Sequence, residues 1–140
     1  MIVRAANKGH LEWLVNEIGF TPRADIRGIV AIDQRERVWG GVAYEGWTAS
    51  SVECHVKIVS PALCRTLLAP AFRYPFIECG RSVITGRIAA SNRRSLRLAD
   101  HLGFHVCGWV RDGRAVGDDW CILQMHRDQC HWLGEDNAVR

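Results

Sequence analysis

The sequence predicts an α/β fold in which helices cover both faces of a mixed β-sheet, and three observations lead to this prediction. Along the whole chain, short apolar runs alternate with segments whose apolar residues have helical spacing. Three of the runs follow one another without an intervening helix, which is typical of a meander. The length of 140 residues indicates one domain, residues 1–140, that can bury a core without disulfides.

The chain begins with a short strand and a helix. Met1–Arg4 is compatible with a first strand. Apolar residues at helical spacing then predict an amphipathic helix over Asn7–Ile18, and Gly19 is placed to end it.

Three consecutive strands are predicted next, over Ile26–Ile32, Val38–Tyr44 and Ser51–Val59. The polar segment Asp33–Arg37 between the first two indicates a hairpin turn. In the third strand, apolar and polar residues alternate with a period of two, so one of its faces is polar. This polar face consists of Glu53, His55 and Lys57.

The second half predicts two helices and three strands. Ser60-Pro61 has the pattern of a helix start, and this helix should run through Leu63, Leu67 and Leu68. Pro70 and Pro75 should interrupt or kink it. The remaining predicted elements are a strand over Ser82–Ala90, a helix over Asn92–Leu102 that stops at Gly103, and strands over Phe104–Val110 and Trp120–Met125 joined by a turn over Arg111–Asp119.

Composition excludes several classes of protein. The net charge of +3 is too small to indicate nucleic-acid binding. No apolar run approaches the ~20 residues that span a bilayer, and the first residues do not have the pattern of a signal peptide. We therefore expect a cytoplasmic protein without a membrane partner. The six cysteines are loosely spaced, which favours free thiols and no bound metal over disulfides.

The segment from Asn92 to Gly108 resembles the GCN5-related N-acetyltransferases. An Asn92-x-x-Ser95 helix start follows a predicted strand, Leu102-Gly103-Phe104 ends that helix, and Gly108 lies in the next strand. The pattern is most similar to the branch that acetylates ribosomal-protein alanines. The resemblance implies a sheet of six or seven strands, whose third and fourth long strands, Ser51–Val59 and Ser82–Ala90, splay apart into a V-shaped cleft.

The resemblance also implies a reaction, in which a primary amine attacks acetyl-CoA directly in a ternary complex. The acceptor amine, a small molecule or a peptide, is not identified by the sequence, and a homodimer stays open. The implied cofactor-binding residues are the strand backbone of Val56, Lys57, Ile58 and Val59, together with Arg65, Asn92 and Ser95. Ser95 would also protonate the departing thiolate.

Candidates for the general base lie on the polar face of Ser51–Val59. Glu53 and His55 point the same way, two residues apart, and either can accept a proton directly or through water. The simpler alternative is that both are solvated residues of an ordinary strand face. Glu45 and Trp47, at the end of the preceding strand, are further candidates for lining the acceptor channel.

Two departures from the family pattern support an alternative function. The segment Ser60–Leu68 stands where the family has a glycine-rich loop for the pyrophosphate, but it contains no glycine. Ala99 occupies the position where many members carry a tyrosine that acts as general acid. The alternative is therefore a protein of the same fold that serves as a non-catalytic binding or regulatory module.

Overall fold

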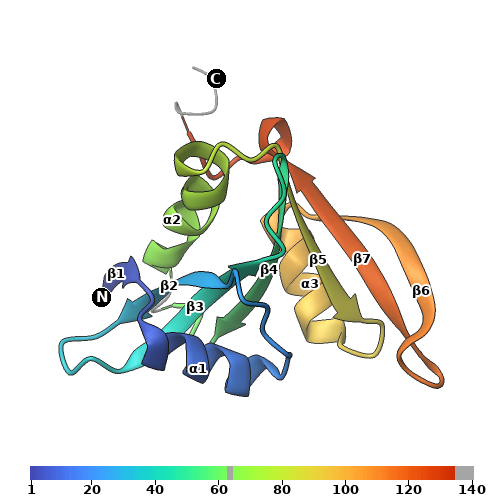
Figure 1. Cartoon of the computed structure of the whole chain (residues 1–140), viewed down its shortest axis with the longest axis horizontal. Helices are drawn as coiled ribbons and strands as arrows, with labels where there is room; N and C mark the ends of the chain where they lie inside the picture. Colours follow the sequence, from blue (N-terminus) through green and yellow to red (C-terminus); the bar gives the residue numbers. More distant parts are fainter. Residues whose placement is uncertain (63–64, 135–140) are drawn as a thin grey trace.

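The computed structural model of the chain describes residues 1–62 and 65–134 and contains a seven-stranded sheet (Figure 1). The strand order is β1-β2-β3-β4-β5-β7-β6. Neighbouring strands are antiparallel except β4 and β5, which are parallel, so the sheet is mixed as predicted. The strands are β1 (Ile2–Ala5), β2 (Arg27–Ile32), β3 (Val38–Glu45), β4 (Ser51–Ile58), β5 (Val83–Ala89), β6 (His105–Ala115) and β7 (Asp118–His126).

Helix α1 (Lys8–Ile18) forms where the apolar spacing predicts it. The side chain of Asn7 caps its first turn by accepting a hydrogen bond from the backbone N–H of His10 at 2.9 Å. Gly19 ends the helix with φ of +84°, a left-handed conformation that glycine adopts without a steric penalty.

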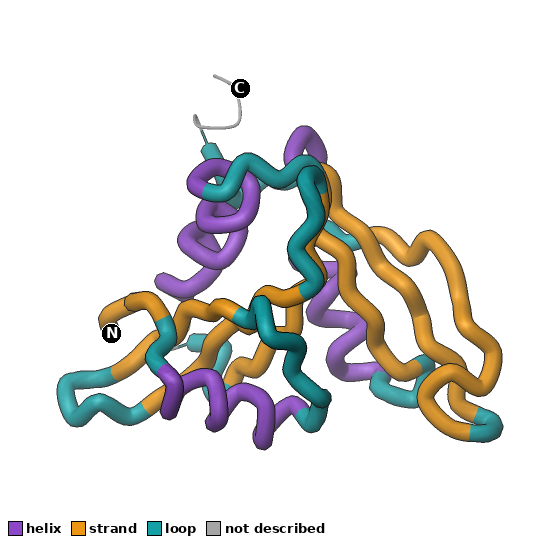
Figure 2. The backbone as a smooth tube through the Cα atoms, in the orientation of Figure 1, coloured by secondary structure: helices purple, strands orange, loops and turns teal. Residues whose placement is uncertain are grey.

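The protein has two cores, one on each face of the sheet, and successive side chains of β2 point alternately into one and the other. Val30 and Ile32 pack with Leu14 of α1. Ile29 and Ala31 belong to the larger core on the opposite face, which includes residues of helices α2 (Leu68–Arg73) and α3 (Arg93–Leu102). Figure 2 shows the helices around the sheet, and the prediction that they cover both faces is confirmed.

The prediction of a helix that starts at Ser60-Pro61 is wrong. Residues 61–62 form a turn, a short 3-10 helix follows over Arg65–Leu67, and α2 begins at Leu68; Leu63 and Cys64 lie outside the described residues. Pro70 is the third residue of α2, where a missing N–H costs no intrahelical hydrogen bond. Pro75 does interrupt the helix, because the chain continues there as a π-helix over Tyr74–Glu78.

The prediction of a long turn over Arg111–Asp119 is also wrong. Strand β6 extends to Ala115, and only residues 116–117 form the turn to β7. The side chain of Asp119 accepts the N–H of Asp112, and the side chain of Asp112 accepts the N–H of Gly117. These bonds extend a hairpin whose strand β6 is exposed along almost its whole length, so its polar sequence resembles that of a loop.

Two further expectations concern the cysteines and the membrane. The five cysteines that the structure describes, at positions 54, 79, 107, 121 and 130, are all free thiols. In residues 1–62 and 65–134, no helix has the length and apolar character required to cross a membrane.

Candidate functional site

Strands β4 and β5 separate after a short paired stretch and leave a cleft between them. They pair only from Ser51–Val83 to Glu53–Thr85. Beyond this point each strand bonds only to its outer neighbour, β3 or β7. The resulting cleft has a volume of about 560 Å³, and Figure 1 shows the two strands diverging. The predicted V-shaped opening between these two strands is therefore present.

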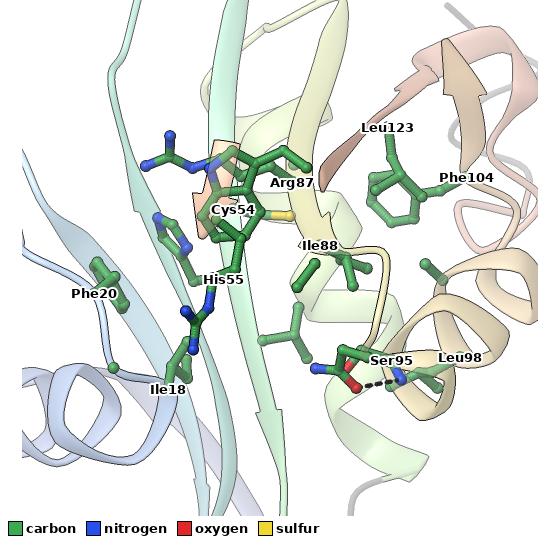
Figure 3. Close-up of a pocket in the computed structure, with 18 of the residues that line it drawn as sticks. Ile18, Phe20, Cys54, His55, Arg87, Ile88, Ser95, Leu98, Phe104 and Leu123 are labelled. Carbon is green, nitrogen blue, oxygen red and sulfur yellow. Dashed lines mark hydrogen bonds between the residues drawn. The ribbon is translucent and has the colours of Figure 1, made fainter. Parts of the chain in front are cut away.

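The cleft is lined from both faces of the sheet (Figure 3). Ile18 and Phe20, at the end of α1 and in the loop after it, line one side. Leu98 and Ala99 of α3 line the other side. The walls between them come from the unpaired parts of β4 and β5, including His55 and Arg87. Two molecules could therefore reach the gap between β4 and β5 from opposite faces.

Three titratable side chains meet on the α1 face beside the paired end of β4. His55 Nε2 lies 2.6 Å from Glu45 Oε2 and 3.8 Å from Glu53 Oε1. Glu45 is the only buried charged residue among those described, and its Oε1 accepts the backbone N–H of Arg23 at 2.7 Å. The sequence predicted Glu53 and His55 here, and the structure adds Glu45 as the direct partner of His55.

The partner of His55 determines which ring nitrogen can act as a base. An ionised carboxylate only accepts hydrogen bonds, so the bond to Glu45 requires the proton of the neutral ring to be on Nε2. The free lone pair is then on Nδ1. The ring also stacks on Phe20, with centroids 3.9 Å apart and planes inclined by 12°. Carboxylate and aromatic contact together fix the orientation of the imidazole.

Two arginines that the sequence analysis did not single out, Arg23 and Arg87, flank Glu53. Arg23 approaches Glu53 Oε2 and Arg87 approaches Glu53 Oε1, each at 3.6 Å. The Arg87 guanidinium also lies 5.1 Å from the ring centroid of Trp120, another residue of the cleft wall. Arg87 is a lone charge in an otherwise uncharged strand, which is the one signal that could have identified it.

At the α3 end of the cleft lie two of the predicted residues, Asn92 and Ser95. The side-chain oxygen of Asn92 accepts the N–H of Ser95 at 3.2 Å and caps the helix. The amide nitrogen of Asn92 takes no part in this cap. The structure therefore brings both residues to the cleft, whereas Trp47 is not among the lining residues and packs against Tyr44 and Tyr74.

The other predicted cofactor-binding residues divide into two groups. Val56 lines the cleft. Lys57, Ile58, Val59 and Arg65 are not among the lining residues, and the N–H of Val59 already donates to the carbonyl of Trp39. Arg65 is exposed and is the first residue of the 3-10 helix that precedes α2. Their contact with a cofactor stays a prediction.

Positive charges disfavour metal binding by the three side chains around His55. Glu45, Glu53 and His55 have ligand atoms within 4.8 Å of one another, close enough to hold an ion. The guanidinium groups of Arg23 and Arg87, however, already place two positive charges beside Glu53. A divalent cation would be repelled by both.

Cys54 also lines the cleft but is a poor nucleophile. Burial, with a smaller effect of the neighbouring Glu53 charge, raises the pKa of its thiol from 9.0 to about 12. The thiol is therefore protonated at neutral pH. Reactions in this cleft must use another group.

Comparison with solved structures identifies the fold. No protein-family model and no curated protein sequence matches the chain. Structures of the spermidine N-acetyltransferase SpeG of Vibrio cholerae do match it, at 18% sequence identity. The complex with manganese ions has a TM-score of 0.72, with 91% of this chain and 92% of that chain covered. The F149A mutant has a TM-score of 0.75 (97% and 99%), and a dodecameric form 0.74 (96% and 96%).

Proposed function

We propose that the chain transfers an acetyl group from acetyl-CoA to a primary amine in a ternary complex. The observation that carries the proposal is the cleft between β4 and β5, which is lined from both faces of the sheet and has His55 in its wall. Direct transfer requires two substrates to meet at one point, and this cleft has the form to accept them. The fold shared with N-acetyltransferases supports the same reaction.

The open edge of β4 fits the extended arm of acetyl-CoA. Because Val59 donates its N–H to Trp39 on β3, alternation along the strand turns the backbone groups of Val56 and Ile58 toward the cleft. Unpaired strand edges bind extended ligands through such groups. Val56 and Ile58 are thus our candidates for holding the arm, and Asn92 for contacting it through its side-chain amide.

In the proposed mechanism, acetyl-CoA supplies the thioester and this chain moves the protons. His55 Nδ1 takes a proton from the ammonium group of the acceptor, because Nε2 is held by Glu45. The neutral amine nitrogen then forms a bond to the thioester carbon, and the carbon–sulfur bond breaks. Ser95 donates a proton to the departing thiolate and is reprotonated through water by the second proton of the attacking nitrogen, which the new amide must lose. Glu53, flanked by two arginines, stabilises the protonated imidazole rather than acting as the base.

A second candidate function is a binding module of the same fold that does not catalyse transfer. It is favoured by the segment between β4 and α2, which has no glycine-rich loop and whose Arg65 is outside the cleft lining. A phosphate group would find few backbone donors there. This candidate predicts that ligand binding survives substitution of His55 while no amine is ever acetylated.

The test is a turnover assay with acetyl-CoA and a panel of amines, in which released CoA thiol and the mass of the acetylated product are both measured. We expect His55→Ala to lower kcat by about 100-fold or more, as the loss of a general base does. The matched control is His105→Ala, which removes an exposed histidine at the start of β6 that is not among the residues lining the cleft. Equal turnover in both variants would show that His55 is not the base.

The assembly of the protein belongs to this proposal as well. The neighbouring SpeG structure is described as dodecameric, and we expect at least a homodimer for this chain. Strand β6 is an edge of the sheet and exposes Val106, Trp109 and Val110. Exposed apolar edges favour pairing with another chain, and sedimentation of the purified protein would measure it.

A further inference from the structure

We infer that the acceptor is a small amine that carries a carboxylate of its own, such as an α-amino acid, and not a polyamine. This inference rests on the proposed function and assigns the substrate class of the same site. It follows from the way in which charges are layered around His55. The carboxylates are deep, with side-chain exposures of 4% for Glu45 and 17% for Glu53, whereas the arginines that cover them are exposed.

An incoming molecule meets the positive layer first. Arg23 and Arg87 have side-chain exposures of 57% and 47%, and the exposed Arg114 also lines the cleft. No aspartate or glutamate is among the lining residues that the structure describes. A polyamine would bring several positive charges to this surface and would find the two carboxylates beside His55, Glu45 and Glu53, already bonded to His55 or ion-paired with arginine.

The spacing of the groups suits a compact molecule with both an amine and a carboxylate. His55 Nε2 and Arg87 Nε are neighbours of the same oxygen atom, Glu53 Oε1, at 3.8 and 3.6 Å. The imidazole ring that carries the proposed base Nδ1 and the guanidinium of Arg87 therefore lie within reach of one small molecule. Its ammonium would face Nδ1 of His55 while its carboxylate faced Arg87.

The guanidinium of Arg87 has the donors that this role requires. Its contact with Glu53 at 3.6 Å is an ion pair longer than a hydrogen bond, so its N–H groups can still form a bidentate pair with a carboxylate. The contact with Trp120 holds the guanidinium at the wall of the cleft. Figure 3 shows the Arg87 side chain extending toward the side of the cleft where His55 lies.

The test compares acceptors that differ in a single charge. The twenty common α-amino acids, putrescine and spermidine are assayed with acetyl-CoA, and each accepted amino acid is compared with its amide. We expect kcat/KM for the amino acid to exceed that for its amide by about 100-fold, since a charged hydrogen-bonded pair is lost. Binding is measured in parallel, as the rise in melting temperature that each acceptor causes in the presence of CoA.

Variants show whether Arg87 binds the carboxylate of the acceptor. Arg87→Gln should raise KM for the amino acid with little change in KM for the amide, and Arg23→Gln should act in the same direction. The control is Arg35→Gln, in the exposed turn between β2 and β3. Each of three results would overturn the inference: better turnover or binding of spermidine than of any amino acid, equal use of an amino acid and its amide, or neither binding nor turnover of any amino acid. Titration of the protein with acetyl-CoA alone does not involve the acceptor. It therefore tests the proposed function separately from the identity of the acceptor.

Discussion

Replacement of Glu45 should affect stability and turnover together, because this one carboxylate holds both the loop after α1 and the imidazole of His55. The buried group accepts the N–H of Arg23 at 2.7 Å and lies 2.6 Å from His55 Nε2. Hydrogen bonds to a charged group contribute about 1.5–3 kcal/mol each. Because the Arg23 N–H can regain water in the variant, we expect Glu45→Ala to lower the free energy of unfolding by about 3 kcal/mol.

For a chain of this length, 3 kcal/mol corresponds to a fall in melting temperature of about 10 °C. Glu45→Gln keeps one acceptor oxygen and should lose about half as much. Glu45→Ala should also lower kcat by about 100-fold, because His55 loses the partner that orients it, whereas Glu45→Gln should lower kcat by less. The assays are thermal unfolding and thiol release, with Glu12→Ala as the control on the exposed face of α1. A melting temperature of Glu45→Ala within 2 °C of this control would refute the reasoning.

Two further predictions use matched variants. Asn92→Ala should lower the free energy of unfolding by about 1 kcal/mol through loss of the α3 cap, and it should also reduce the thermal shift produced by acetyl-CoA. Asn7→Ala should lose only the equivalent cap of α1. If Asn92→Ala kept the full thermal shift, Asn92 would be a helix cap and not a cofactor contact. The pKa of Cys54 is raised from 9.0 to about 12 in the folded protein. At pH values between these two, the thiol is protonated when folded and ionised when unfolded, so the free energy of unfolding falls as the pH rises through this range. Urea unfolding at pH 8 and pH 10 should show a steeper loss for wild type than for Cys54→Ala, and parallel losses would contradict this.

The regular elements could be predicted because their residues interact with neighbours in the sequence. Asn7 and Gly19 mark the ends of α1, and the alternation of β4 identifies the face that carries Glu53 and His55. Local patterns failed where the determining contact is distant or ambiguous. Pro70 looked like an interruption but lies in the first turn of α2. The second half of β6, Arg111–Ala115, looked like a turn because it is polar and exposed.

From the residue pattern alone, the histidine–carboxylate part of the candidate site was predictable only where it lies on one strand. Glu53 and His55 share the polar face of β4, so their proximity follows from the period of two. Glu45 reaches them from β3 through the strand register, in which it faces Glu53. Phe20 and Arg87 come from a loop and from β5, and no local pattern relates their positions to His55.

The most direct test of the central claim is calorimetric titration with acetyl-CoA of a variant in which the cleft is filled. Gly86 lines the cleft, and a Cβ there would make an ordinary contact of 3.7 Å with the carbonyl of Cys54, so a side chain can start at this position without displacing the backbone. Gly86→Val is the filling variant, and its thermal unfolding shows that it is folded before the titration. Gly108→Val is the control, since a Cβ at this position on β6 meets nothing within 4 Å. We predict that wild type and Gly108→Val bind acetyl-CoA with the same affinity while Gly86→Val binds at least tenfold more weakly; equal affinity in all three proteins, or no binding by wild type at millimolar acetyl-CoA, would contradict the assignment of the cleft.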